Sequence, residues 1–260
     1  MRHALAIARR EIESYFVSPI ACAVMTVFTF VSGLFFSNML VHYVRQAALA
    51  DSQIQKFGRS DLQLDVPTVV LAQFFQNEAF LLMLAIPLLT MGLVTDERRK
   101  GTIELLMTSP VRGIEIVIGK FLGAMSLYGA MLGVTLIHIG VLFAYGNPEW
   151  KPILTGYLGL VLLGGCFVSV GLFFSSLTKN QIVAGMFTFV VLLLLWVIGW
   201  IGNFSGPTVE RLTSYLSLTS HVDDFLRGVI DSQHVVYYLS FITFGLFLTA
   251  KAVDSERWRG

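Results

Sequence analysis

The sequence contains one glycine-containing run, residues 113–120, whose spacing is close to that of a phosphate-binding loop. Gly113 to Lys120 has the glycines and the lysine of a phosphate-binding loop, whose backbone N–H groups cradle phosphates. However, one residue too many separates the glycines, and Phe121 stands where a magnesium-binding Ser or Thr is needed. The sequence also has no H-E-x-x-H, G-x-S-x-G or C-x-x-C pattern. We therefore predict that the chain holds no nucleotide, cofactor or metal and is not itself an enzyme.

Ionisable residues inside apolar runs could form a proton or ion path, because each is costly in hydrocarbon. His138 is the only one deep in a run, and we interpret it mainly as a neutral imidazole hydrogen-bonded to a neighbouring helix. Glu78, Glu115 and Lys120 lie near the ends of runs, from which long side chains can reach water. Proton-coupled carriers and voltage-driven channels usually contain more intramembrane charge than this.

A dense cluster of charge lies between Thr95 and Pro110, and residues 96–100 are all ionised. Gly101 breaks the chain, Thr102 is a good N-cap, and Glu104 falls in the first turn, where the helix dipole favours an acid. The apolar face of the predicted short helix comprises Ile103, Leu106 and Met107. A solvated loop would not need such a helix, so its one-sided face predicts a docking partner.

Composition places these residues in a membrane protein. The 260 residues are 55% hydrophobic and only 13% charged, whereas soluble domains average roughly 25% charged. The net charge of +1 gives no sign of nucleic-acid binding. A membrane-spanning helix needs about 20 mostly apolar residues. Six runs qualify, namely Ile20 to Val41, Ala79 to Val94, Ile116 to Ala144, Ile153 to Leu177, Ile182 to Ile201 and Val235 to Val253.

The distribution of lysine and arginine predicts the orientation, since these residues are retained on the cytoplasmic side. With the N-terminus inside, the inner segments hold about 12 of the 18 basic residues. Both termini and the charged cluster would then face the cytoplasm. The outer loop from His42 to Asn77 is polar without a strong period, and Pro67 is its clearest break.

Shorter helices are predicted at both ends of this bundle. Residues 1–19 read as an amphipathic helix in the membrane interface, although an ordinary cytoplasmic helix is the alternative. Its apolar stripe comprises Leu5, Ala8, Ile12, Tyr15 and Phe16. Residues 207–231 predict two short outer helices, the second beginning at Ser220 in a capping box with Asp223. Within the spans, Gly119 with Gly123 and Gly129 with Gly133 have the spacing of close helix contacts, as does Gly33 with Ser37.

The charged cluster also resembles a known family. Glu97 to Leu106 reads E-R-R-K-G-T-I-E-L-L and is followed by Thr108-Ser109-Pro110. This pattern is similar to the E-[RK]-x-x-G-T-[LIM]-E-x-L-x-[TS]-x-P signature of ABC-2 type permeases, and the likeness covers almost the whole chain. More narrowly, REIESYFVSPIACAVMTVFTFVSGLFF and SHVDDFLRGVIDSQHVVYYLS resemble the gliding-motility-associated permease subgroup.

The resemblance implies an all-α bacterial inner-membrane subunit that works as a dimer, with residues 20–253 as its six-helix domain and 254–260 as a cytoplasmic tail. Two copies of a separate ATP-binding subunit, which bind ATP and magnesium, would dock on a coupling helix at about residues 96–110. The coupling residues implied by the motif are Glu97, Arg98, Arg99, Gly101, Thr102, Glu104 and Leu105. A protein with a large extracytoplasmic domain is a further partner implied by the subgroup.

Two functions therefore stay open from the sequence. The leading hypothesis is the permease of an ATP-driven exporter, and the second is a non-transporting membrane anchor that drives an extracytoplasmic partner. An intramembrane enzyme is not favoured, since the spans contain no plausible pair of catalytic groups. The absence of charge clusters on the span faces favours a lipid or other amphipathic cargo, but the substrate is not determined.

Overall fold

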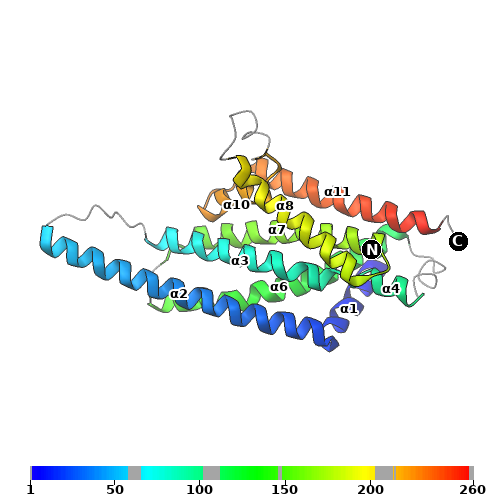
Figure 1. The fold of residues 1–260 in the computed structure, drawn as a ribbon, viewed down its shortest axis with the longest axis horizontal. Helices are drawn as coiled ribbons and strands as arrows, with labels where there is room; N and C mark the ends of the chain where they lie inside the picture. Colours follow the sequence, from blue (N-terminus) through cyan, green and yellow to red (C-terminus); the bar gives the residue numbers. More distant parts are fainter. Residues whose placement is uncertain are drawn as a thin grey trace.

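The computed structural model describes residues 2–57, 66–101, 112–145, 148–202, 213 and 215–257. This part of the chain is helical and contains no β-strand, so the predicted all-α fold is confirmed. Its helices are α1 (Arg2–Val17), α2 (Pro19–Phe57), α3 (Val66–Thr90), α4 (Thr95–Arg99), α6 (Gly113–Tyr145), α7 (Trp150–Leu177), α8 (Gln181–Gly202), α10 (Leu218–Leu226) and α11 (Ser232–Arg257). The long helices lie side by side, and both chain ends are at the end of the bundle that carries α4 (Figure 1).

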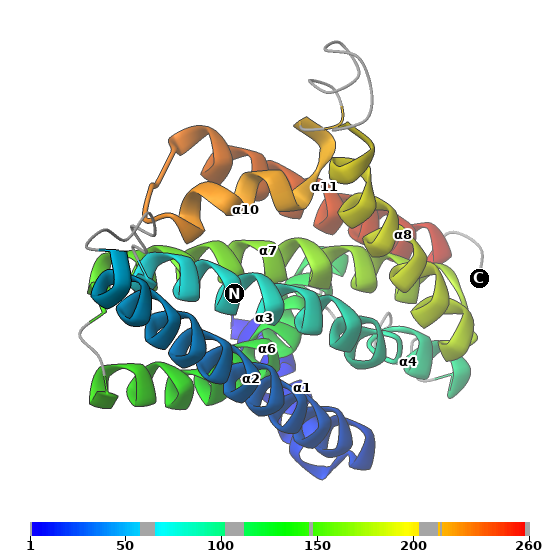
Figure 2. The ribbon, with the colours of Figure 1, turned by 60° about the vertical axis from the view of Figure 1, so that its left-hand side comes forward.

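Within the described residues, six helices are long and apolar enough to cross a membrane, as predicted. They cover Pro19–Gln46, Val70–Arg99, Gly113–Tyr145, Trp150–Leu177, Gln181–Gly199 and Ser232–Ser255. Helix α7 occupies the centre, where it contacts α3, α6, α8, α10 and α11 (Figure 2). It is also the most buried span, with 72% of its apolar window inside the bundle, against 22% for α2 and 17% for α11. The peripheral spans α2 and α11 therefore present large apolar surfaces suited to lipid.

Glycines allow the neighbouring helices to approach α7 closely. A Cβ atom on Gly164 would overlap the Tyr128 ring of α6, and one on Gly171 would overlap the Thr90 hydroxyl of α3. Tyr128 is 1% exposed and donates its hydroxyl hydrogen to the Leu160 carbonyl over 2.6 Å. Close packing of this kind holds membrane helices together where lipid provides no hydrophobic driving force.

The helix boundaries at the end of the bundle away from α4 differ from the prediction. Helix α2 continues beyond Val41 to Phe57, and α3 begins at Val66 instead of Ala79. The apolar run ends at Val41, but the helix continues because the more polar residues 42–57 contain no Gly or Pro to break it. Pro67 lies in the first turn of α3, where its missing N–H has no helical partner to lose.

The second outer helix, α10, is confirmed as a helix, but its predicted N-cap was wrong. The Ser217 hydroxyl accepts the Ser220 backbone N–H over 3.3 Å and caps the helix at Leu218. Ser220 is therefore the residue that is capped. Most of the first predicted outer helix, from residue 207 to 212, lies outside the described residues.

Helix α1 packs against the first half of α6, and its predicted apolar stripe is divided. A Cβ atom on Gly119 would lie 2.8 Å from both the Ala4 carbonyl oxygen and the Ile7 Cβ, and one on Gly123 would lie 2.6 Å from the Glu11 Cβ. Ala8 is buried, whereas Leu5 is 64% and Phe16 68% exposed. Gly119 and Gly123 thus let α1 approach α6 closely, while the large apolar side chains of Leu5 and Phe16 point away from the bundle.

Candidate functional site

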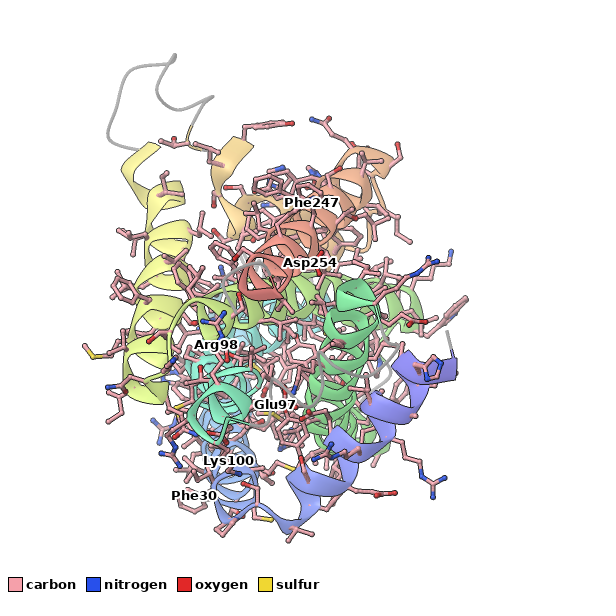
Figure 3. All side chains as sticks on the ribbon, turned by 90° about the vertical axis from the view of Figure 1, so that its right-hand side faces the viewer. Phe30, Glu97, Arg98, Lys100, Phe247 and Asp254 are labelled. Atoms are coloured by element: carbon pink, nitrogen blue, oxygen red, sulfur yellow. The ribbon has the colours of Figure 1, made fainter. Side chains whose placement is uncertain are left out.

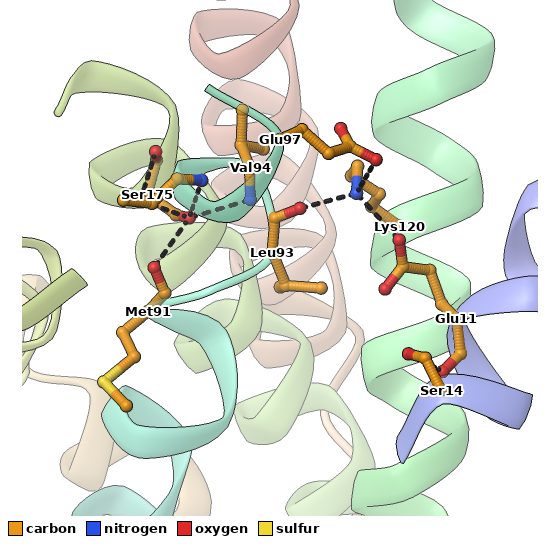
Figure 4. Close-up of polar contacts among 9 residues, drawn as sticks. Glu11, Ser14, Met91, Leu93, Val94, Glu97, Lys120 and Ser175 are labelled. Carbon is orange, nitrogen blue, oxygen red and sulfur yellow. Dashed lines mark hydrogen bonds and ion pairs between the residues drawn. The ribbon is translucent and has the colours of Figure 1, made fainter. Parts of the chain in front are cut away.

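The charged cluster begins in a turn that is fixed by one serine of the central helix. The Ser175 hydroxyl oxygen on α7 accepts the backbone N–H groups of Val94, over 3.0 Å, and Thr95, over 3.2 Å. Its hydrogen is donated to the Met91 carbonyl over 3.1 Å, and the Thr95 hydroxyl donates to the Ser175 carbonyl over 2.9 Å. Both side chains are fully buried, so the start of α4 is held to α7 by satisfied hydrogen bonds (Figure 4).

A buried lysine holds α4 from the other side. The Lys120 Nζ of α6 contacts Glu97 Oε1 of α4 at 3.0 Å and Glu11 Oε1 of α1 at 2.7 Å. It also donates to the Leu93 carbonyl over 2.5 Å. An ammonium group has three N–H donors, and these acceptors use all of them. Figure 4 shows Glu97, Glu11 and the Leu93 carbonyl converging on Lys120.

The burial of these groups explains why Lys120 requires both acids. The lysine side chain is 2% exposed, and those of Glu11 and Glu97 are 18% and 22% exposed. A buried ammonium costs several kcal/mol of desolvation unless it is paired and hydrogen-bonded. The Glu11–Lys120–Glu97 arrangement, here called the lysine node, therefore couples the positions of α1, α4 and α6.

Two further contacts complete the setting of α4. The Gln181 side-chain amide at the start of α8 donates to the Asp96 carboxylate. At the other end, Gly101 has φ 70° and its N–H donates to the Arg98 carbonyl over 3.3 Å. This left-handed conformation favours glycine and ends the helix, in agreement with the predicted break at Gly101. Figure 3 shows Glu97, Arg98 and Lys100 gathered around α4.

A cavity of about 270 Å³ lies beside the lysine node, between α1, α2, α3, α4 and α8. Glu11, Tyr15, Asp96 and Gln181 are among its lining residues. Burial, followed by the nearby Glu11 carboxylate, raises the pKa of Tyr15, so its hydroxyl stays neutral at physiological pH. Among the residues that the structure describes, no group of three His, Cys, Asp or Glu side chains could hold a metal ion.

The predicted site residues are only partly placed by the structure. Glu97 joins the lysine node, Arg98 is half-buried, Arg99 is exposed, and Gly101 ends α4. The prediction for Thr102, Glu104 and Leu105, together with the rest of the proposed coupling helix, lies outside the described residues.

Sequence reasoning missed Glu11, Lys120 and Ser175. The expectation that Lys120 reaches water from a span end was wrong, because it is 1% exposed and hydrogen-bonded across the bundle. The only available signal was that a lysine in a long apolar helix needs counter-charges. That signal does not identify Glu11, which lies 109 residues earlier in the sequence.

The fold and the site define a class of protein. It is a membrane-spanning helical bundle in which the lysine node and Ser175 join a charged segment at one end to several helices. Residues 5–253 match the model of the family described as ABC-2 family transporter protein, and the chain belongs to this family. This confirms the broad family resemblance. Members are membrane permease subunits and are not themselves catalytic.

Curated relatives agree with the family assignment. The chain is 29% identical over 161 residues to the probable multidrug ABC transporter permease YbhR of Escherichia coli K12, and the O157:H7 protein matches equally. The aligned region covers 61% of this chain but only 41% of each relative. The chain thus spans less than half the length of these relatives.

Proposed function

We propose that this chain is the permease subunit of an ATP-driven exporter in a bacterial inner membrane, with both termini in the cytoplasm. A separate ATP-binding subunit would bind ATP and magnesium and dock on the segment from about residue 96 to 110. The lysine node is the observation that carries this proposal, because it joins the first part of that segment to the bundle through Glu97.

The turn at the start of α4 would transmit force from a docked subunit to the membrane-spanning helices. A push on α4 acts directly on α6 through Lys120 and on α7 through Ser175, because both contacts are buried and fully hydrogen-bonded. Well-packed interfaces switch between discrete arrangements instead of deforming continuously. Closure of the ATP-binding subunits would therefore be transmitted as a rigid-body movement of spans.

The finer features of the complex follow from the family resemblance. We infer a permease dimer with two ATP-binding subunits, and a gliding-motility-type accessory protein with an extracytoplasmic domain as a further partner. An amphipathic cargo fits the apolar span faces and agrees with the multidrug role that the names of the E. coli relatives give them. ATP-dependent flux of such a cargo in vesicles would distinguish the exporter from an anchor that only transmits force.

Assembly with the cognate ATP-binding subunit tests the docking part of the proposal. Glu104→Arg reverses a charge on the proposed docking helix and should abolish co-purification of that subunit. Glu13→Arg is the matched control, because Glu13 pairs with the exposed Arg9 on α1. Undiminished co-purification of the Glu104→Arg permease would contradict docking at this helix.

A further inference from the structure

A carboxylic acid lies inside the membrane-spanning region of this protein. Glu78 is 12 residues before Thr90, the cytoplasmic end of α3, and so lies about 18 Å along the helix from that end. The hydrocarbon core is about 30 Å thick. The expectation that Glu78 reaches water from a span end was wrong, since α3 begins at Val66 and extends well beyond Glu78 on the outer side.

The side chain of Glu78 is sealed between α2 and the rest of the bundle. It is 1% exposed, and its Oε1 accepts the hydroxyl hydrogen of the fully buried Ser32 on α2 over 2.5 Å. Its Oε2 is buried and has no hydrogen-bond partner among the described residues. Within that part of the chain, a single neutral hydroxyl is therefore the only hydrogen-bonding group given to this carboxyl.

The titratable groups that face Glu78 supply no counter-charge. Tyr128 of α6 and Tyr157 of α7 are close enough to interact electrostatically with it. Their hydroxyls are used elsewhere, by the Leu160 carbonyl and by Thr135 respectively. The ring of His138, on α6, contacts Phe36 of α2 and Phe74 of α3. No Lys or Arg forms an ion pair with Glu78 in the part of the chain that the structure describes.

The hydrogen bond predicted between His138 and a neighbouring helix is not formed among the described residues. Its Nδ1 is buried and has no hydrogen-bond partner among the described residues, so the ring is held by aromatic packing. A neutral imidazole suits this apolar setting, whereas an imidazolium would be a buried charge whose Nδ1–H lacks a hydrogen-bond acceptor among the described residues.

An ionised carboxylate in this setting would be a buried charge with one hydrogen bond, which is far more costly than a neutral acid. We infer that Glu78 is an intramembrane proton-binding site, and that its bound proton allows α2 to pack on α3. Separation of the two helices would admit water and release the proton, and the resulting carboxylate would oppose repacking. Helix α2 suits such a movement, as only 22% of its apolar window is buried.

Infrared spectroscopy of the full chain alone tests the proton directly, without an ATP-binding subunit. We expect the difference spectrum of wild type minus Glu78→Gln, in lipid vesicles near neutral pD, to show the C=O band of a neutral carboxyl group. Glu13→Gln is the matched control and should reveal an ionised carboxylate, because Glu13 is exposed beside Arg9. Carboxylate bands in the Glu78 spectrum would overturn the inference.

Thermal unfolding tests the link between the proton and packing. Unfolded glutamate loses its proton above about pH 4.3, whereas packed Glu78 keeps it, so the contribution of Glu78 to stability should fall as pH rises from about 5 to 8. Glu78→Gln, which mimics the neutral acid, should remove this part of the slope. Ser32→Ala should lower stability but retain the slope, since it removes only a hydrogen bond. Equal slopes for wild type and Glu78→Gln would exclude the linkage.

Discussion

At the scale of single residues, the structure places its few buried charges where they join elements distant in sequence. Lys120 satisfies its three donors with Glu11, Glu97 and the Leu93 carbonyl. The motif around Glu97 indicated a partner outside the chain, whereas the structure shows that Glu97 also has a partner within it.

Loss of the Lys120 ammonium should destabilise the protein strongly. Lys120→Met removes the buried ammonium that both the Glu11 and the Glu97 carboxylates contact, and we expect a loss of about 3 kcal/mol in the free energy of unfolding. Unfolding in mixed micelles with increasing SDS measures this. Arg9→Gln breaks the exposed Arg9–Glu13 pair and should change stability by less than about 0.5 kcal/mol. Similar losses for the two variants would show that the node contributes no more than a surface pair.

Gly101 provides a second test at this scale. Its φ of 70° is unfavourable for other L-residues, although no atom of the described residues lies within 4 Å of the place that an added Cβ would occupy. Gly101→Ala should therefore cost about 1 kcal/mol through the backbone alone, while Gly101→Asn should cost less. Equal unfolding midpoints for wild type, Ala and Asn variants would mean that this turn does not constrain the fold.

At the scale of elements, the sequence was informative about which segments are helices and poor at their ends. Apolar runs identified all six spans, because a membrane helix must satisfy its own backbone. The runs could not reveal that α2 reaches Phe57, since polar residues without Gly or Pro continue a helix beyond the apolar segment. Nor could they reveal that α3 begins at Val66, because Pro67 fits the first turn of a helix instead of breaking it. For the same reason, the burial of Glu78 was missed.

The glycine pairs show the same limit. The spacing of Gly119 with Gly123 and of Gly129 with Gly133 is identical, yet among the described residues only the first pair contacts another helix, α1. Gly119→Ala should displace α1 and cost about 1–3 kcal/mol, whereas Gly133→Ala has open space and should be neutral or slightly stabilising. Unfolding in mixed micelles compares the two variants, and equal effects would contradict the α1–α6 packing.

Helix α10 should confer a pH dependence on the outer end. His221 is 4% exposed, donates Nδ1–H to the Ser217 carbonyl over 2.8 Å, and stacks on Tyr237. Burial lowers the pKa of His221, with His234 acting in the same direction and the Ser217 carbonyl and Asp224 opposing. At His221 the unfolded chain therefore takes up a proton that the folded chain resists, and the contribution of His221 to stability should fall as pH drops through about 6.5.

A variant without this histidine isolates the contribution. His221→Asn retains a donor toward Ser217 but cannot become charged, so its thermal midpoint should fall less than that of wild type on acidification. Melting curves at matched pH values provide the comparison. A His221→Asn midpoint that responds to acidification just as the wild-type midpoint does would contradict the assigned role of His221.

At the scale of the whole molecule, the bundle is organised around α7, and the end at which we propose docking carries α4 and both chain ends. The sequence motif located the charged segment and the family, but the contacts of Lys120 and Ser175 depend on tertiary packing that a motif does not encode. The chain belongs to the ABC-2 transporter family, and we propose that the lysine node is the physical connection through which an ATP-binding subunit acts.

The most direct test of this account is the ATPase activity of the assembled complex with Glu97→Gln in the permease. This change removes the charge that meets Lys120 but leaves the proposed docking helix intact. We predict that the complex still forms and that permease-dependent stimulation of ATP hydrolysis is largely lost, while Glu13→Gln behaves as wild type. Full stimulation in the Glu97→Gln complex would contradict transmission through the lysine node.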